Sequence, residues 1–246
     1  MTRVPTLPHL SAREKEATVR DLLSARSGVY HASSNPSGDD HAPAPPRGSQ
    51  RHGTYFLYNN WDFNAFGTIF ERATGKEIYD TFDAELARPL HMQDFDRAAQ
   101  RKGGDPALSV HRAYHFRLST RDLARVGQLM LHEGSWSGRQ LVPREWVHES
   151  TRVVTRVGDM NPSSRRRGPW GYGYLWWVWD GQWAAGAYRG ASAAHGMGGQ
   201  HLAVLPALDL VVAHETGNDD GQRVSHAEFL QILDVLVRAR CRTVPC

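Results

Sequence analysis

Lysine is scarce in this chain of 246 residues, and so are cysteine and long apolar runs. Three lysines occur and the formal net charge is +3, so the positive charge comes from scattered arginines rather than from a basic face. The one arginine cluster, Arg165-Arg166-Arg167, stands among Pro, Ser and Gly, which is typical of a solvated loop. We therefore expect no nucleic-acid partner. No apolar run approaches the roughly 20 residues of a membrane-spanning helix, so we expect no membrane span.

The sequence also lacks the residue patterns that are typical of a metal site and of a disulfide framework. The two cysteines, Cys241 and Cys246, stand at the end of the chain without histidines at ligand spacing, and a disulfide between them would close only a small terminal loop. None of the 13 histidines forms an H-x-x-x-H pair with a glutamate on a helix. The sequence therefore predicts no metal and no cofactor.

Residues 55–75 contain the strongest helix signal and the first candidate site. Apolar residues recur at helical spacing and predict one inward face, and Gly75 is typical of a helix end. Asn59 or Asn60 is suited to cap the helix start, because a short amide oxygen accepts from free main-chain N–H groups. The same junction places the phenol of Tyr58 two residues before Asn60. The face consists of Phe63, Phe66, Ile69, Phe70 and Ala73.

Other segments contain residues that are typical of helix starts and of hairpin turns. Thr18, Ser119 and Ser225 each precede an apolar periodic run and predict a helix start, and Pro143 predicts the first turn of a helix over 144–149. A further helix is expected over 78–86. Asp180-Gly181 predicts a hairpin between strands 171–178 and 182–188, and Pro206-Ala207 a second one between strands 201–205 and 208–214. Helices, an antiparallel meander of about four strands and a terminal helix indicate an α+β fold.

Tyr58-x-Asn60, the following helix that ends in Thr-Gly, and Arg88-Pro89-Leu90-His91-Met92 resemble the second active-site region of the β-lactamase-related serine hydrolases. This superfamily includes penicillin-binding proteins, class C β-lactamases, esterases and amide-oligomer hydrolases. The resemblance covers about residues 18–240. It implies one antiparallel sheet flanked by helices with a mostly helical subdomain, in a single domain over 1–246. Within that domain it implies a cleft-bordering loop at 31–53, a helical region at 54–150, and strands with a C-terminal helix at 168–240.

The nucleophile motif of that family is absent from the sequence. Members supply a serine and its base as Ser-x-x-Lys, but alanine stands three residues before each lysine. Three explanations are open: the chain is a fragment incomplete at its N-terminus that lacks the first strands and the Ser-x-x-Lys helix, it is a pseudoenzyme, or another serine serves. Localisation stays unknown, because the first residues contain no signal core but a lost N-terminus would remove one. The lysines are Lys15, Lys76 and Lys102.

The third motif of the family is a glycine-rich strand facing the nucleophile. The candidate here is His195-Gly196-Met197-Gly198-Gly199, where glycines let a substrate lie close to the main chain. A gapless count from Pro206 places Ala191-Ser192-Ala193 there instead, and both registers remain open.

The resemblance implies a serine hydrolase acting on a small ester or amide, inactive as given because its nucleophile is missing. A non-catalytic pseudoenzyme that binds a ligand or partner is the alternative. Tyr58 and Asn60 are the catalytic candidates, and an incomplete sheet edge predicts self-association. The substrate-binding candidates are Trp61, His195, Gly196, Gly198 and Gly199.

Overall fold

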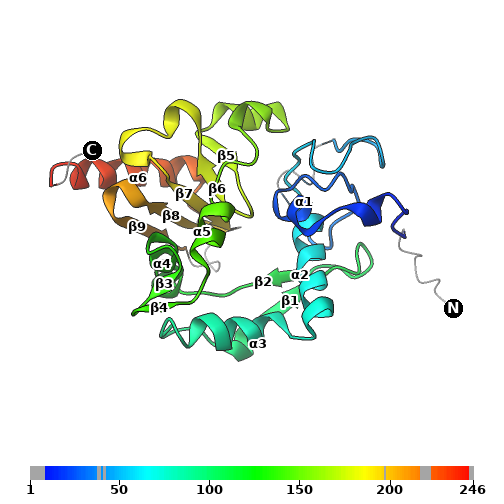
Figure 1. Ribbon diagram of the computed structural model, residues 1–246, viewed down its shortest axis with the longest axis horizontal. Helices are drawn as coiled ribbons and strands as arrows, with labels where there is room; N and C mark the ends of the chain where they lie inside the picture. Colours follow the sequence, from blue (N-terminus) through cyan, green and yellow to red (C-terminus); the bar gives the residue numbers. More distant parts are fainter. Residues whose placement is uncertain (1–8, 38–39, 41–42, 197, 217–222, 244–246) are drawn as a thin grey trace. The chain divides into compact units, whose positions relative to one another are not determined.

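A computed structural model describes residues 9–37, 40, 43–196, 198–216 and 223–243 (Figure 1). The chain divides into two compact units, each built from separate segments. The first comprises Met1–Asp83, Asp96–Arg117 and Gly158–Gly168. The second comprises Ala84–Phe95, Leu118–Val157 and Pro169–Cys246. Among the described residues, no helix is long and apolar enough to cross a membrane.

The first unit is built around one long helix, α2. This helix packs against the short helix α1, and the buried side chains of Leu22, Val29, Trp61 and Ala65 form their shared core. A small antiparallel hairpin, which the sequence did not predict, joins it through β1 and β2. The bounds are η1 Glu14–Glu16, α1 Val19–Leu23, α2 Asn60–Thr74, α3 Ile78–Phe82, η4 Arg97–Ala99, β1 Arg101–Gly103, β2 Ala113–His115 and η6 Ser163–Arg167.

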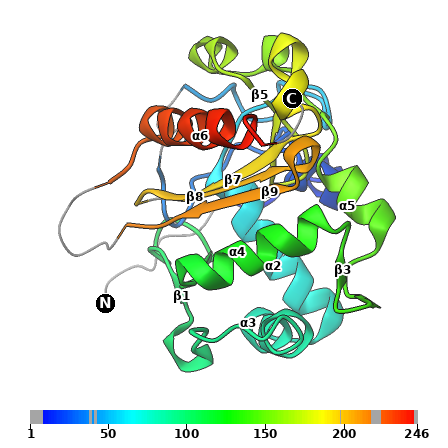
Figure 2. The same cartoon turned by 90° about the vertical axis from the view of Figure 1, so that its left-hand side faces the viewer.

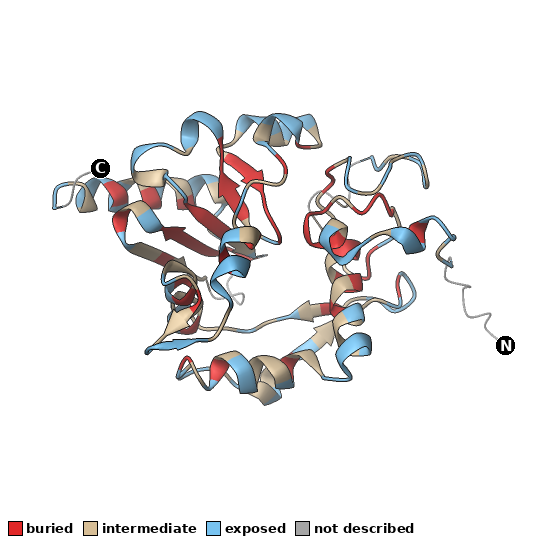
Figure 3. Ribbon diagram, in the orientation of Figure 1, coloured by how far each residue is buried: buried red, intermediate tan, exposed pale blue. Residues whose placement is uncertain are grey.

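The second unit contains a five-stranded antiparallel sheet in the order β5-β6-β7-β8-β9. Its strands β5 and β6 are fully buried, and so is β8 except for Gln200 (Figure 3). The remaining elements are helices and a second small hairpin, β3–β4. The bounds are α4 Thr120–Leu131, β3 Ser135–Trp136, β4 Arg139–Gln140, α5 Arg144–Ser150, β5 Trp170–Tyr172, β6 Trp177–Trp179, η7 Gly181–Trp183, η8 Gly186–Tyr188, β7 Ser192–Gly196, β8 Gln200–Leu205, η9 Pro206–Leu208, β9 Leu210–His214 and α6 His226–Arg240.

Two helices cover opposite faces of this sheet. In Figure 2 α6 lies on one side of the strands β7, β8 and β9 and α4 on the other. The Phe229 ring of α6 stacks on His201 of β8 at 4.6 Å between centroids. On the other face α4 packs against β8 and β9. The predicted α+β class, with helices flanking an antiparallel sheet, is confirmed.

The capped helix starts are confirmed. Thr18 and Ser225 each form a capping box, with Asp21 and Glu228 respectively. The Ser119 hydroxyl accepts from the main-chain N–H of Asp122 at 3.2 Å. Each of these signals lies within four residues, so local sequence was sufficient to find it. The helix expected over 78–86 is α3 followed by one π turn at Asp83–Ala87, labelled η3.

The predicted strand over 182–188 is wrong. Gly181 and Gly186 have φ of +59° and +54°, and two 3₁₀ turns, η7 and η8, occupy this segment. The chain reverses earlier, between β5 and β6, where Leu175 has φ of +62°. The sequence gives no signal for this turn at the residue that takes the positive φ, because positive φ is rare for leucine. The next strand is β7, in which Ser192 pairs with Val178 of β6.

The predicted inward face of α2 is also wrong. Trp61, Asn64 and Ala65 are buried, whereas Ile69 is 38% exposed. The amide of Asn64 is buried because it donates to Asn35 at 2.8 Å and lies 3.3 Å from the Ser33 hydroxyl. Hydrogen bonds to residues distant in the sequence therefore help to decide which side of α2 is buried, and this side is not the predicted apolar stripe. The left-handed end at Gly75, with φ of +68°, is confirmed. Cys246 lies outside the described residues.

Close packing of α4 on the sheet makes Gly127 sensitive. A Cβ there would lie 2.5 Å from Cγ1 of Val211 and 2.7 Å from Cδ1 of Leu202. We predict that Gly127→Ala lowers the free energy of unfolding by about 1–3 kcal/mol in urea titrations, despite the higher helix propensity of alanine. Gly158→Ala is the control, because its Cβ would meet nothing within 4 Å. Equal stability of both variants would contradict the tight α4 contact.

Candidate functional site

The start of α2 is built on a buried carboxyl. The side-chain oxygen of Asn59 accepts from the main-chain N–H of Asp62 at 2.9 Å, and its amide donates to the Leu57 carbonyl at 2.8 Å. The Asp62 side chain is fully buried and accepts from the Ser27 hydroxyl at 2.6 Å. Of the two candidate caps, Asn59 is the one used. These bonds fix the main-chain conformation around Tyr58 and Asn60.

Asn60 ties the helix start to the long loop. Its main-chain N–H donates to Oδ1 of Asp40 at 2.9 Å. Its side-chain amide donates to Oδ2 of Asp40 at 2.7 Å and to the Ser37 hydroxyl at 2.8 Å. The same amide lies 3.2 Å from the Asn35 carbonyl, so the structure gives Asn60 a loop-anchoring role. Its expected contact with a substrate amide stays a prediction.

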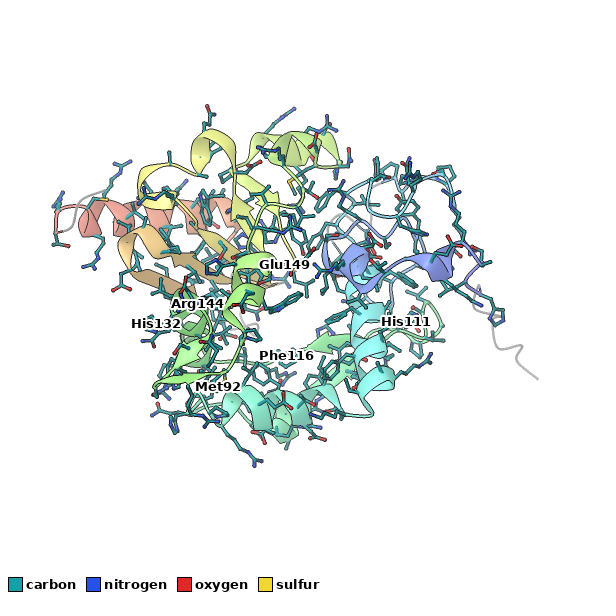
Figure 4. All side chains as sticks on the ribbon, viewed as in Figure 1. Met92, His111, Phe116, His132, Arg144 and Glu149 are labelled. Atoms are coloured by element: carbon teal, nitrogen blue, oxygen red, sulfur yellow. The ribbon has the colours of Figure 1, made fainter. Side chains whose placement is uncertain are left out.

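Tyr58 and Trp61 lie on either side of Asn60 in the sequence but pack differently. The Tyr58 ring is half-buried and contacts Phe63 edge-on, with centroids 4.9 Å apart. Trp61 is 6% exposed and stacks on the His31 ring at 5.4 Å. On its other side it meets His111 edge-on at 5.3 Å. Figure 4 labels His111 beside α2, where its Nδ1 lies 3.1 Å from the Thr68 hydroxyl.

Trp61 lines a cavity of about 340 Å³ in the first unit. Basic and imidazole side chains converge on it, and it has no acidic lining residue among those described. Burial lowers the pKa of both His31 and His111, so they are neutral at pH 7, while a lysine and an arginine supply positive charge. The side chains that give the cavity its chemistry are His9, Lys15, His31, Trp61, Arg72 and His111.

One wall of this cavity is held by an ion pair between a buried carboxylate and a guanidinium that is 45% exposed. Glu14 is 4% exposed and binds Arg47 through two hydrogen bonds, Nε to Oε1 at 2.8 Å and Nη2 to Oε2 at 2.6 Å. Arg47 holds the pKa of the Glu14 carboxyl low, at about 2. The His31 Nε2 lies 3.1 Å from the same carboxylate. The imidazole is therefore fixed in place against Trp61.

The glycine-rich segment of the second unit forms the tight turn between β7 and β8. Gly198 and Gly199 have φ of +99° and +89°, and Gly196 pairs with Gln200. A Cβ on Gly199 would lie 2.6 Å from the Thr216 hydroxyl. The hairpin itself therefore requires glycine, whether or not a substrate binds there. Met197 lies outside the described residues, and the alternative register at Ser192 falls on the same strand.

The side chain of His195 points to the face of the sheet covered by α6. Its ring lies 4.3 Å from that of His226 and 4.7 Å from that of Trp170. The neighbouring pair Ala194 and Leu202 faces α4 instead, because side chains alternate along a strand. The expected role of His195 in substrate binding stays a prediction, and the ring is engaged in the layer between sheet and helix.

The sequence did not reveal two groups of polar side chains. The cavity residues come from segments up to about 100 positions apart, and no local spacing connects them. The second group consists of His195, His201 and His226, whose potential ligand atoms lie within 4.8 Å of one another. Strand register and helix docking bring these histidines together, so H-x-x-x-H spacing was the wrong test for them.

The fold described above, an antiparallel sheet with helices on both faces, belongs to the α+β class. The β-lactamase family model matches residues 4–232, and the chain belongs to that family. A comparison with curated proteins finds no match.

Solved structures with the same fold include a putative 6-aminohexanoate-dimer hydrolase from Bacillus anthracis. Its TM-score is 0.67 at 17% identity, covering 94% of this chain and 63% of that one. EstCE1, a hydrolase with promiscuous acyltransferase activity, has a TM-score of 0.62 at 17% identity, covering 90% and 72%. The octameric penicillin-binding protein homologue from Pyrococcus abyssi has a TM-score of 0.59 at 18% identity, covering 89% and 56%. The chain thus spans less than two thirds of the length of the first and third of these proteins.

The buried Asp62 predicts an unusual pH dependence of stability. Burial raises its pKa to about 8 from an ordinary 3.8, so the folded state keeps a proton that the unfolded state loses. Stability from this group is full below pH 4 and declines as the pH rises from about 4 to about 8. We predict that Asp62→Asn flattens the decline between pH 5 and 8 in urea titrations. Asp159→Asn, at an exposed aspartate, is the control. Parallel curves for the wild type and Asp62→Asn would contradict the buried neutral carboxyl.

Proposed function

We propose that this chain is the substrate-binding part of a serine acyl-transfer hydrolase that acts on a small ester or amide. The observation that carries the proposal is the Tyr58-x-Asn60 motif, held at the capped start of α2 in a chain that belongs to the β-lactamase family. Tyr58 supplies the phenol that relays a proton between nucleophile and leaving group. The glycine-rich turn with Gly196, Gly198 and Gly199 supplies main-chain groups that approach the acyl group closely.

Catalysis by this mechanism needs a nucleophile and a base that takes its proton. The three lysines follow Ala12, Ala73 and Ala99 at the spacing where the family has serine. A phenol with an ordinary pKa near ~10 is a poor base without a neighbouring cation. We therefore propose that the chain as given forms no acyl-enzyme, and that Tyr58 becomes effective only beside a Ser-x-x-Lys segment.

The cavity beside Trp61 supports a small substrate with an anionic group. Its volume of about 340 Å³ is at the small end of the range for ligand pockets. Lys15 and Arg72 supply positive charge, and the indole of Trp61 offers an apolar face. A carboxylate carried on a short acyl or amide chain matches both features. The putative 6-aminohexanoate-dimer hydrolase that shares the fold is consistent with an amide substrate of this size.

A non-catalytic, ligand-binding protein is the second candidate. The missing Ser-x-x-Lys favours it, because binding through the cavity needs no nucleophile. The two candidates differ in one measurable property: only the first gains hydrolysis when a Ser-x-x-Lys segment is supplied.

The catalytic test uses nitrocefin and p-nitrophenyl butyrate with intact-mass detection of an acyl adduct. We predict no adduct with the chain as given. In a version that carries a Ser-x-x-Lys segment we predict hydrolysis, and Tyr58→Phe lowers its rate by at least about 100-fold, as expected for a lost proton relay. Tyr55→Phe, three residues away, is the matched control. Unchanged activity of Tyr58→Phe would overturn the assignment, and an adduct on the chain as given would identify another serine as nucleophile.

Self-association is the second prediction. On α6 the side chains of Ile232, Val235 and Leu236 share one face and are 39%, 66% and 41% exposed. Burying such a face in a second copy is favourable. We predict that light scattering after size exclusion gives a mass above the 27.6 kDa of one chain. If α6 forms the contact, Val235→Glu shifts the measured mass toward that of one chain. If the edge of the sheet forms the contact, the same variant leaves the measured mass unchanged. A monomer with a sharp cooperative melt would contradict self-association.

A further inference from the structure

Three histidines from three elements meet on the α6 side of the sheet. His195 in β7 and His201 in β8 are direct register partners, so their side chains lie on the same face. His226 is the first residue of α6, directly after the capping residue Ser225. The Nδ1 atoms of His195 and His201 are 3.0 Å apart, and potential ligand atoms of all three rings lie within 4.8 Å of one another.

The orientation of His201 is fixed by its second ring nitrogen. Its Nε2 lies 2.9 Å from the Val224 carbonyl, an acceptor, so this nitrogen carries the proton and donates it. The lone pair of His201 is then on Nδ1, which faces His195. Metal-binding histidines are typically oriented by such a bond from the other nitrogen to a carbonyl.

Aromatic packing restricts the three rings further. Phe229 stacks on His201 at 4.6 Å, and Trp170 contacts His195 and His226 edge-on at 4.7 and 6.0 Å. Four nitrogen ligands at about 2.0–2.1 Å from a tetrahedral ion lie roughly 3.4 Å from one another. The closest pair, at 3.0 Å, is already near that separation, and small ring rotations bring the third ligand from within 4.8 Å.

We propose that His195, His201 and His226 bind one divalent transition metal ion of the Zn²⁺ type, with water as the fourth ligand. Three imidazoles with one open position is a set that suits Zn²⁺, and Co²⁺ and Ni²⁺ accept the same donors. On binding, the hydrogen bond between the two Nδ1 atoms is replaced by coordination. His195 then binds through the tautomer that carries its proton on the other ring nitrogen.

The ion would join the turn between β7 and β8 to the start of α6. That turn contains Gly196, Gly198 and Gly199, so metal binding would stiffen the segment that carries the glycine-rich motif. The inference does not depend on the proposed hydrolase chemistry, because it concerns binding and stability alone. Its failure leaves the role of Tyr58 untouched.

The test is titration of the full chain, without an affinity tag, with Zn²⁺ and with Co²⁺. We expect one equivalent to bind, the visible absorption of tetrahedral Co²⁺, and a melting temperature that rises with metal concentration. Because protons compete for imidazole, binding should weaken as the pH falls below about 6.

Two variants separate this site from the other histidines of the chain. His226→Gln keeps the capping box of Ser225 and Glu228, and we expect it to weaken binding by more than about 100-fold and to remove the Co²⁺ absorption. His214→Gln is the matched control: its ring lies 6.2 Å from that of His201, and its Nδ1 contacts the Gly199 carbonyl at 3.0 Å. We expect it to bind as the wild type does.

Three outcomes would overturn the site. They are the absence of stoichiometric binding, binding that persists unchanged in His226→Gln, and an equal loss in His214→Gln. Circular dichroism of each variant without metal shows whether a loss of binding reflects a loss of folding. If His226→Gln does not fold, His195→Gln in the same titration decides the question.

Discussion

The buried carboxyl of Asp62 is the constraint on which the candidate site depends. The carboxyl accepts from Ser27, and the main-chain N–H of the same residue donates to Asn59, so the segment around Ser27 is joined to the first turn of α2. Placing a carboxyl there without a charged partner is costly unless it keeps its proton. The arrangement holds the backbone of residues 58–61 in one conformation. The phenol of Tyr58, the amide of Asn60 and the indole of Trp61 all take their positions from it.

The sequence predicted helix starts and ends correctly where the hydrogen-bond partners lie within one turn of each other. The caps at Thr18, Ser119 and Ser225 were predictable, because a hydroxyl and its main-chain partner lie within one turn. The left-handed end at Gly75 was predictable for the same reason. Two features had no such signal. The turn at Leu175 uses a residue that rarely adopts positive φ, and the buried side of α2 is set by hydrogen bonds of Asn64 to residues about 30 positions away.

Side-chain clusters were the least predictable part of the candidate site. The cavity beside Trp61 collects side chains from the N-terminal segment, from α2 and from the loop before β2. The histidine cluster depends on the pairing of His195 with His201 and on where α6 begins. Neither can be deduced without the tertiary structure, whereas the family resemblance could be read from Tyr58-x-Asn60 and the segments after it. Membership of the β-lactamase family is shown by the family model, and the structure adds side-chain groups that no sequence spacing connects.

The buried, protonated carboxyl of Asp62 is the central claim, because the position of the Tyr58-x-Asn60 segment depends on it. The pKa of this carboxyl in the folded chain, measured by carboxyl-carbon NMR, tests the claim most directly. A pKa of about 8 is predicted, because the carboxyl is fully buried. A pKa near the ordinary 3.8 would contradict it.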